Sequence, residues 1–367
     1  MTRVRDVLAA IDRAAPFALQ SESDNSGLLV GDPAAPVRTI AVALDPTPPN
    51  IREARRRRAQ CLVTHHPLFW TKLKTLSPDS HVGASVLEAG RAEVALIAAH
   101  TNYDNAVGGL NDLLARRLGL RDSAPLRPSA AARSYKVVVF VPAGDLERVQ
   151  RALFQAGAGH IGDYAECSFR VAGTGTFRGG ASTHPTVGRR GRREEVPELR
   201  LETVVPAGCV EAVVRALRAA HSYEEPAFDL HPLDVLREGA GLGRVGELKR
   251  PESLAAFIRR VKRALGVRTV EVIGSAGRRI SRVALVSGGG GDVWPLAVQA
   301  GADVYLTGEM KHHDRLAARD GGLTVVLAGH YATEYPAVAG LVKMLRSALP
   351  DVRVLPLASE RDPTAWR

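Results

Sequence analysis

The sequence predicts an α/β protein: a layered host domain that carries a metal site at the ends of its strands, with a ferredoxin-like (βαββαβ) domain inserted into it. Apolar runs of strand length alternate with amphipathic helical segments in both halves of the chain, which favours parallel strands covered by helices. Between the halves the pattern changes to strand, helix, two strands, helix and strand. Histidines and acids follow three host strands, and this clustering predicts a metal site.

The N-terminal part of the host is predicted over residues 1–133. It begins with a helix over residues 3–19, where the apolar side chains of one helical face are Val4, Val7, Leu8, Ile11 and Ala15. We expect "SESDNSGLLVGDP" to be a loop. The next segments alternate between strand and helix: "VRTIAVALD", "PPNIREARRRR", "AQCLVTHH", residues 80–90, "AEVALIAAH" and "LNDLLARRLGL". This alternation predicts parallel pairing.

Residues 134–235 are predicted to be the inserted ferredoxin-like domain. Its six segments are "YKVVVFVPA", "LERVQRALFQAG", "AECSFRVAGTGTFRG", "ELRLETVVPA", "CVEAVVRALRAAH" and "PAFDLHPL". The Pro- and Ala-rich "SAPLRPSAAARS" and the Gly-rich "REGAGLGRVG" mark its edges. The C-terminal part of the host, residues 236–367, continues with a Ser-capped helix in "SLAAFIRRVKRALG" and strands in "SRVALVSGGGGD", "ADVYLTGEMKHHD" and "GLTVVLAGHYATE".

The composition is that of a soluble globular protein, because 45% of the 367 residues are apolar and 24% are charged. The chain contains no stretch of about 18 uncharged apolar residues, so we expect no membrane span. Cys61, Cys167 and Cys209 are far apart and form no CxxC pair, which argues against a disulfide framework and a thiolate zinc site. We therefore expect a cytoplasmic protein.

The formal net charge is +10, and basic residues gather in "REARRRR" at 52–58 and "GRRGRR" at 188–193. Such runs can neutralise phosphates, so nucleic acid is one candidate partner. The alternative, which we favour, is a solvated helix face and a solvated loop. Aromatic residues make up only 5% and do not interleave with the basic runs, which weakens the case for single-stranded nucleic acid.

Three host strands lead into residues that commonly bind metals. These residues are, strand by strand, His65 with His66, His100 with Asp104, and His330 with Glu334. In open α/β sheets the strand ends converge on one crevice, so these side chains can share a site. Neighbouring residues within a strand point to opposite faces. The adjacent His65 and His66 therefore fit a turn that aims each ring at a separate target.

Imidazole and carboxylate ligands suit Zn, Fe, Mn or Co. The histidines and acids at the three strand ends are more ligands than one open catalytic ion needs. Two divalent ions about 3.5–4 Å apart, bridged by one carboxylate, would use the full set. Glu334 is the predicted bridge, because we expect it in the first turn of a helix, where the positive end of the dipole orients a carboxylate. With a metal-bound water, Glu334 is also our best catalytic candidate. His65 and His66 would each bind one ion.

Most candidates also have a purely structural interpretation. His100 can be a hydrogen-bonded core residue, and Asp104 can serve the turn in "NYDNAVGG". His330 and Glu334 can form a helical ion pair. We expect His330 before the helix start, which weakens that alternative. The adjacent pair at positions 65 and 66 is hard to explain by packing.

Three further features allow two interpretations each. In "KHHD" only one imidazole can face inward, and we expect His313 to contact the metal-ligating side chains or the substrate. A solvated helix start is the alternative for His313. His100 and Asn25 are the other two residues expected to make such a contact. Asp24 and Asn25 either line the pocket or cap a turn. The run Gly288–Gly291 either approaches a phosphate or forms a tight turn, and we favour the turn.

Four motifs in order, "THHPLFW", "HTNYDNAVGGLND", "TGEMKHHD" and "GHYATEYPA", resemble those of the Nif-three-like family. Its members are also known as GTP cyclohydrolase I type 2 homologues or dinuclear metal centre hexameric proteins. The resemblance covers nearly the whole chain. The middle segment, which ends in "HSYEEPAFDLHPL", resembles the PII- or CutA-like domain of the longer bacterial members. One departure is "SESDNSGLLVG", where relatives often carry an aromatic residue before the Asp-Asn pair.

This resemblance implies an α/β host fold, a toroidal homohexamer built from trimers, and two bound metal ions. The residues that match the family's ligands are His65, His66, Asp104, His330 and Glu334, and His100 matches a family histidine close to the site. The family name alone does not imply a cyclohydrolase activity.

The leading functional hypothesis is a two-metal hydrolase, cyclohydrolase-like or phosphoesterase-like, that acts on a phosphorylated or nucleotide-like small molecule. One alternative is a metal-bearing ring that binds or regulates a partner such as nucleic acid. Another is a metal chaperone without catalysis. Metal-dependent turnover and salt-dependent binding of labelled strands distinguish these hypotheses.

Overall fold

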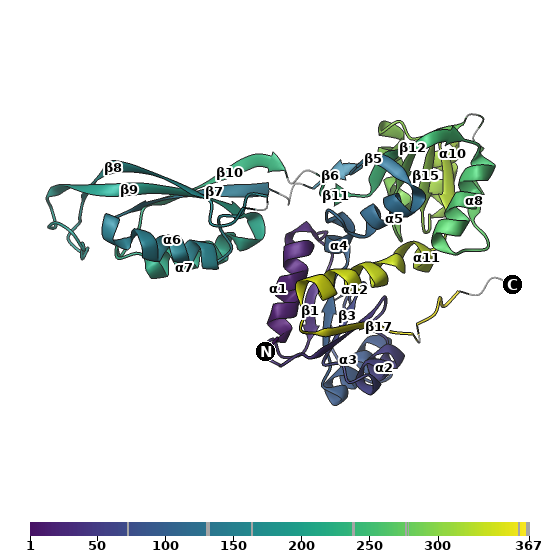
Figure 1. The fold of residues 1–367 in the computed structure, drawn as a ribbon, viewed down its shortest axis with the longest axis horizontal. Coiled ribbons are helices and arrows are strands. Elements are labelled where there is room, and N and C mark those ends of the chain that lie inside the picture. Colours follow the sequence, from purple (N-terminus) through teal and green to yellow (C-terminus); the bar gives the residue numbers. More distant parts are fainter. Residues whose placement is uncertain are drawn as a thin grey trace. The chain divides into compact units, whose positions relative to one another are not determined.

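The computed structural model describes residues 1–71, 73–129, 133–162, 164–236, 239–275, 277, 279–358 and 360–364. They fall into two compact units (Figure 1). The first unit combines Met1–Ser129 with Gly239–Arg367, and the second is Ala130–Glu238. None of the helices in the described part of the chain is both long enough and apolar enough to cross a membrane.

The first unit contains a five-stranded sheet with the order β1-β4-β3-β2-β17. Its strands are β1 (Gly27–Val30), β2 (Thr39–Ala43), β3 (Cys61–Thr64), β4 (Ala95–Ala98) and β17 (Arg353–Pro356). β17, β2, β3 and β4 pair in parallel, as the alternation of strands and helices predicts. Every residue of β2, β3 and β4 is buried, which explains their continuous apolar sequence.

The sequence prediction missed two strands of this sheet. β1 lies inside the segment that we expected to be a loop, and it is antiparallel to β4. β17 follows the last predicted helix and pairs with β2. Each strand has four residues, and its partner is distant in the sequence. Such short runs carry too little periodicity to be distinguished from a loop.

A six-stranded sheet with the order β13-β16-β15-β14-β12-β5 completes the first unit, together with the short pair β11-β6. The strands are β5 (Leu120–Ala124), β6 (Arg127–Pro128), β11 (Gly241–Leu242), β12 (Arg244–Glu252), β13 (Glu271–Ile273), β14 (Ile280–Leu285), β15 (Val304–Thr307) and β16 (Thr324–Leu327). Only β14, β15 and β16 pair in parallel. β5, β12 and β13, which the sequence patterns did not predict as strands, are antiparallel to their neighbours.

Some helices of the first unit begin at residues whose side chains cap them. The side chains of Thr47 and Ser253 accept hydrogen bonds at the starts of α2 and α8. The helix predicted over residues 3–19 is shorter, because it ends at Ala14 ahead of Pro16. The helices are α1 (Val4–Ala14), α2 (Pro48–Arg56), α3 (His81–Ala92), α4 (Thr101–Asn105), α5 (Leu110–Leu118), α8 (Leu254–Leu265), α9 (Trp294–Gln299), α10 (His312–Asp320), α11 (His330–Glu334) and α12 (Pro336–Ala348), with 3-10 turns at Phe17–Leu19 and Gly290–Val293.

Two helices join the sheets of the first unit. α12 packs on β17, β2 and α1, and it also contacts α5, which packs on β5, β12 and β14 (Figure 1). Their inward side chains are buried and apolar, including Leu114, Leu118, Leu341 and Leu345. This packing brings the residues that follow β3 and β4 close to those that follow β14 and β16.

The second unit has the order β7-α6-β8-β9-α7-β10, and its antiparallel sheet has the order β10-β7-β9-β8. The elements are β7 (Arg133–Val141), α6 (Leu146–Gln155), β8 (Ser168–Arg178), β9 (Arg193–Pro206), α7 (Val210–Ala220) and β10 (Phe228–Leu236), with 3-10 turns at Ala143–Asp145 and Ala207–Cys209. The two helices and the sheet share a buried core that includes Val139, Val149, Val213 and Leu217. β8 is an edge strand whose side chains are mostly exposed.

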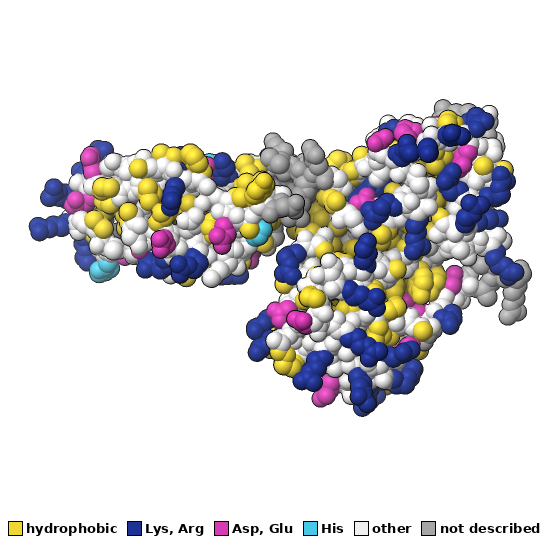
Figure 2. Space-filling model, in the orientation of Figure 1, with side chains coloured by type: hydrophobic (Ala, Val, Ile, Leu, Met, Phe, Trp, Pro, Cys, Tyr) yellow, Lys and Arg dark blue, Asp and Glu magenta, His cyan; other side chains and the backbone are white. Residues whose placement is uncertain are grey.

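The two basic runs lie in different units. The run at 52–58 covers the end of α2, where Arg52 pairs with Glu88 at 3.4 Å and the remaining arginines are exposed. The run at 188–193 lies in the exposed connection between β8 and β9. Figure 2 shows Lys and Arg side chains spread over the visible face rather than gathered in one patch. This distribution fits solvated surfaces.

Candidate metal centre

The adjacent histidines that follow β3 have different partners. His65 Nδ1 is 2.9 Å from the Ala99 carbonyl oxygen, and His66 Nδ1 is 2.7 Å from Asp45 Oδ1. The His66 backbone N–H donates to the Leu44 carbonyl at 2.9 Å, which holds this turn beside the end of β2. An imidazole that donates through Nδ1 keeps its Nε2 lone pair available for a metal.

Glu334 lies between these rings and a third one. Its Oε2 is 2.7 Å from His66 Nε2 and 2.9 Å from His330 Nε2. Its Oε1 is 3.9 Å from His65 Nε2. His330 Nδ1 in turn is 3.0 Å from Glu309 Oε1. The Glu334 carboxylate therefore faces three imidazoles through both of its oxygens.

His100 and Asp104 add a fourth ring and a second carboxylate. His100 Nδ1 is 2.8 Å from Asp24 Oδ1, and its ring centroid is 5.1 Å from that of His65. Asp104 Oδ1 is 3.7 Å from His65 Nε2, and the Ser287 hydroxyl donates to it at 3.2 Å. The structure thus brings together all six residues that the strand ends singled out.

Glu334 controls the protonation of its two closest neighbours. Burial disfavours a charge on His66, but the hydrogen bonds to Asp45 and Glu334 raise its pKa to about 10. The hydrogen bond to Glu334 raises the pKa of His330 to about 9. Burial opposes ionisation of Glu334, yet His330 and His66 hold its pKa well below the ordinary value. Without metal, Glu334 is a carboxylate between two imidazolium rings.

His65 and Asp104 lie in a drier part of the cluster. Burial lowers the pKa of His65 to about 3 and raises the pKa of Asp104 to about 7. His65 is therefore neutral near pH 7. Its buried Nε2 has no hydrogen-bond partner among the described residues. Leaving such an atom unpaired costs about 1–3 kcal/mol, and a cation at the lone pair would remove this cost.

Two overlapping sets of ligand atoms are close enough to hold an ion. One set comes from His65, His66 and His100, and the other from His66, His330 and Glu334. Within each set the ligand atoms all lie within 4.8 Å of one another. Imidazole and carboxylate donors without thiolate suit borderline divalent cations. The residues present therefore fit a divalent metal ion.

The glycine run after β14 forms a turn against this cluster. Gly288 has a φ of +59°, and its N–H donates to Thr333 Oγ1 at 3.0 Å. A 3-10 turn over Gly290–Val293 follows. The structure therefore shows the tight turn that we favoured for Gly288–Gly291.

Glu334 does not lie in the first turn of a helix, contrary to the sequence prediction. His330 begins α11, a helix of only five residues, and Glu334 ends it, before α12 begins at Pro336. The expectation that His330 precedes the helix is therefore also wrong, and the two side chains make the i,i+4 ion-pair contact that the structural alternative described. The helix starts early because Gly329, with a φ of +90°, turns the chain directly after β16. The helix dipole therefore does not orient the Glu334 carboxylate. Hydrogen bonds with His66 and His330 orient it instead.

Within the part of the chain that the structure describes, Asn25 and His313 have no hydrogen bond or ion pair with the six clustered side chains. Asn25 lines a cavity of about 450 Å³ together with Trp70, whose ring lies edge-on to His100 at 5.3 Å. His313 is exposed in the first turn of α10, and its ring contacts that of His312 at 6.0 Å. The structure thus places Asn25 next to the cluster through Trp70 and leaves His313 on the surface.

Three acids that hold the histidines, Asp24, Asp45 and Glu309, were not predicted to do so. Asp45 and Glu309 follow β2 and β15 by two residues each. The strand-end argument that selected the histidines would have found both acids if it had been applied to these two strands. Asp24 belongs to the Asp-Asn pair, for which the sequence left pocket lining and turn capping open.

Known proteins resemble this chain over nearly its whole length. The model of the family described as Duf34/NIF3 (NGG1p interacting factor 3) matches residues 2–363. The chain is 38% identical to a GTP cyclohydrolase 1 type 2 homolog of Halalkalibacterium halodurans over 360 residues, which are 97% of each chain. It is 40% identical to one of Mycobacterium tuberculosis over 354 residues, which are 94% of this chain and 92% of the relative.

A solved structure of a Bacillus cereus protein related to NIF3 has a TM-score of 0.81 to this chain at 36% identity. The match covers 100% of this chain and 99% of that one, so the mixed α/β fold with several sheets is confirmed. The family resemblance seen in the motifs is confirmed as well. The chain belongs to the Duf34/NIF3 (NGG1p interacting factor 3) family.

Proposed function

We propose that the cluster binds two divalent metal ions, Zn, Fe, Mn or Co, through His65, His66, Asp104, His330 and Glu334. The observation that carries this proposal is that each of the three imidazoles is held through Nδ1 by a carbonyl or a carboxylate. Their Nε2 atoms all lie within 3.9 Å of a Glu334 oxygen. Metal-ligating histidines typically have such a partner on the second ring nitrogen. Glu334 directs one oxygen toward His66 and His330 and the other toward His65, so its carboxylate could serve a pair of ions.

We further propose that the protein is a metal-dependent hydrolase for a phosphorylated or nucleotide-like small molecule. When bound, two divalent ions supply Lewis-acid stabilisation and acidify water. Asp45 and Glu309 fix the rings of His66 and His330. Glu334 is our candidate catalytic residue, because it is held as a carboxylate and faces the Nε2 atoms of His65, His66 and His330.

Two cavities beside the cluster support a substrate of this class. One, of about 540 Å³, is lined by Lys311 and Arg315, by residues of the glycine run and by four acids, Glu271, Asp292, Glu309 and Asp314. The Lys311 side chain makes no hydrogen bond or ion pair within the described residues, so its ammonium group is the lining cation available to an anionic group. The other cavity, of about 450 Å³, contains Trp70, which is 61% exposed and available to stack on a planar ring. His100 lies next to that ring and is our candidate for a substrate contact.

Metal analysis beside activity tests the proposal. The purified chain is reconstituted with Zn²⁺, Mn²⁺, Co²⁺ or Fe²⁺, and hydrolysis of nucleotides and sugar phosphates is measured. We expect about two ions per subunit and metal-dependent turnover. Both should be lost in Glu334→Ala and His66→Ala and retained in His160→Ala, which changes an exposed histidine of the second unit. Less than one ion per subunit, unaffected by Glu334→Ala, would contradict the metal centre.

Tightly bound metal without turnover of any compound would instead favour the metal-store or regulatory alternatives. A nucleic-acid partner should give binding to labelled strands that weakens steeply with salt. His313 is the remaining predicted contact. If it serves the substrate, His313→Ala should raise KM while leaving the metal content unchanged.

We also propose that residues 134–235 form an inserted ferredoxin-like domain of the PII or CutA type, and that the protein is a cytoplasmic homohexamer. The sheet order β10-β7-β9-β8, with α6 and α7 on the same side, supports the first part (Figure 1). The name of the relatives, GTP cyclohydrolase 1 type 2 homolog, motivates including GTP among the test substrates. Light scattering after size exclusion should give the mass of six chains; a monomer would contradict the assembly.

A further inference from the structure

The backbone conformation of β8 does not explain why two glycines lie in its middle. Gly173 and Gly175 lie within an eleven-residue strand whose pairing with β9 runs without a register shift, so neither forms a bulge. Neither has a positive φ. Glycine weakens a strand interior, and where no bulge or bend uses it, glycine often marks the close approach of a ligand.

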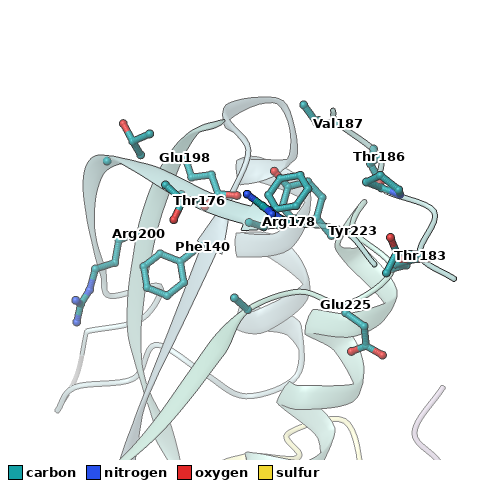
Figure 3. Close-up of a pocket in the computed structure, with 18 of the residues that line it drawn as sticks. Phe140, Thr176, Arg178, Thr183, Thr186, Val187, Glu198, Arg200, Tyr223 and Glu225 are labelled. Atoms are coloured by element: carbon teal, nitrogen blue, oxygen red, sulfur yellow. The ribbon is translucent and has the colours of Figure 1, made fainter. Parts of the chain in front are cut away.

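The space beside these glycines is different at the two positions. A Cβ at Gly173 would meet nothing within 4 Å, so this part of the strand faces open space. A Cβ at Gly175 would lie 2.1 Å from Glu198 Oε2, so the carboxylate of Glu198 rests against bare backbone. A pocket of about 590 Å³ lies here, within the second unit (Figure 3). Its volume is in the range of small-molecule sites.

The pocket has apolar walls and a buried hydroxyl beside a carboxylate. Phe140, Val171, Val187 and Tyr223 contribute the walls. The Tyr223 hydroxyl is buried and lies beside the Glu198 carboxylate. Burial and the neighbouring Glu198 raise the pKa of Tyr223 to about 12, so the hydroxyl keeps its proton. A buried hydroxyl that lines a pocket is a natural contact for a polar group of a ligand.

Some of the charged side chains that line the pocket have an ion-pair partner, and others do not. Arg200 pairs with Glu202 at 2.9 Å, and Glu225 lies 3.9 Å from an arginine of α7. The Arg178 side chain has no hydrogen bond or ion pair within the described residues, and Glu198, which lies beside the Tyr223 hydroxyl, has no ion pair there. Figure 3 shows Arg178 and Glu198 directed toward the same part of the pocket. One cation and one carboxylate are thus available to a ligand.

We propose that this pocket binds a zwitterionic small molecule of the amino-acid type with a large apolar side chain. The ligand carboxylate pairs with Arg178, and its ammonium group pairs with Glu198 beside the ring of Tyr223. The apolar side chain lies on the bare backbone at Gly173, against Phe140. A polyphosphate does not fit this pocket, because Glu198 and Glu224 oppose the single unpaired cation. This site is independent of the metal centre and of the hydrolase proposal.

Calorimetric titration of the full chain tests the proposal. The probes are L-phenylalanine and L-leucine, with phenylpropionate, which lacks the ammonium group, and phenethylamine, which lacks the carboxylate. We expect the amino acids to bind, and each single-charge analogue to bind on the order of tenfold more weakly. Arg178→Gln should weaken the amino acids by a similar factor. Arg170→Gln, which changes an exposed arginine of β8 outside the pocket, should have no effect.

Gly173→Leu provides a second test that does not threaten the fold. Its side chain enters open space rather than a neighbour, so we expect unchanged thermal stability and loss of amino-acid binding. Gly144→Ala, at an exposed glycine outside the pocket with equal free space, is the control. Absence of amino-acid binding to the unmodified chain would overturn the proposal. A change of oligomeric state in Gly173→Leu would also overturn it and assign the pocket to an interface between copies of the chain.

Discussion

Gly288 and Glu334 approach each other so closely that no side chain fits at position 288. A Cβ at Gly288 would lie 1.8 Å from Glu334 Oε1 and 3.2 Å from His330 Nε2. The backbone φ of +59° also lies in the region that favours glycine. The glycine turn after β14 is therefore part of the wall that holds the candidate bridging carboxylate in place.

Gly288→Ala should displace Glu334 and reduce metal binding. We also expect the variant to be about 1–3 kcal/mol less stable, because alanine is strained at this φ and clashes with the carboxylate. Metal content by mass spectrometry and chemical denaturation measure the two effects. Gly289→Ala is the matched control, because its nearest neighbour would be 3.8 Å away and its φ is −81°. Equal metal content in both variants would contradict the role of Gly288.

Glu309→Gln should weaken metal binding about 10- to 100-fold, although Glu309 is not a proposed ligand. Its carboxylate accepts from His330 Nδ1 at 3.0 Å and so fixes the ring. Competition with a chelator of known affinity gives the change. Glu271→Gln, on the same cavity but paired with Arg315, should bind metal as the unmodified chain does.

Metal binding should release protons and strengthen as the pH rises from about 6 to 9. With pKa values raised to about 10 and about 9, His66 and His330 are protonated at neutral pH in the metal-free site and must lose a proton to ligate. His65, whose pKa is lowered to about 3, has no proton to release. Below pH 7, Asp104, with a pKa of about 7, adds a further proton.

Titration calorimetry in buffers of different ionisation enthalpy counts these protons. We expect about two near pH 7.5 and about tenfold stronger binding per released proton for each pH unit. A metal affinity that is constant from pH 6 to 9 would show that the two rings are neutral before binding.

Arg244→Ala should destabilise the first unit by about 3–5 kcal/mol. The Arg244 side chain is 1% exposed, pairs with Asp112 and donates to the carbonyls of Gly241 at 2.9 Å and Ala106 at 3.1 Å. Its loss leaves Asp112 without the cation that it faces. Arg260→Ala removes a half-exposed pair with Glu252 and should cost about 0–1 kcal/mol. Urea denaturation compares the two variants.

The buried parallel strands and most helices of the first unit could be predicted because their signals are local. β2, β3, β4, β15 and β16 are continuous apolar runs, and the prolines at 48 and 49 and the cap at Ser253 mark helix starts. β1, β12 and β17 could not be predicted, because their stability comes from partners far along the chain. The antiparallel pairing of β12 with β5 and β14 has the same origin.

The sequence by itself determined which residue types stand at the strand ends, and so which side chains could meet: His65, His66, His100, Asp104, His330 and Glu334. Only the tertiary structure decided how they meet. It placed Glu334 at the end of α11 instead of a helix start, and it supplied Asp45 and Glu309 as partners of the rings. The physical reason is distance along the chain. His66 and Glu334 are 268 positions apart, and their hydrogen bond depends on how two sheets pack through α5 and α12, which no local pattern encodes.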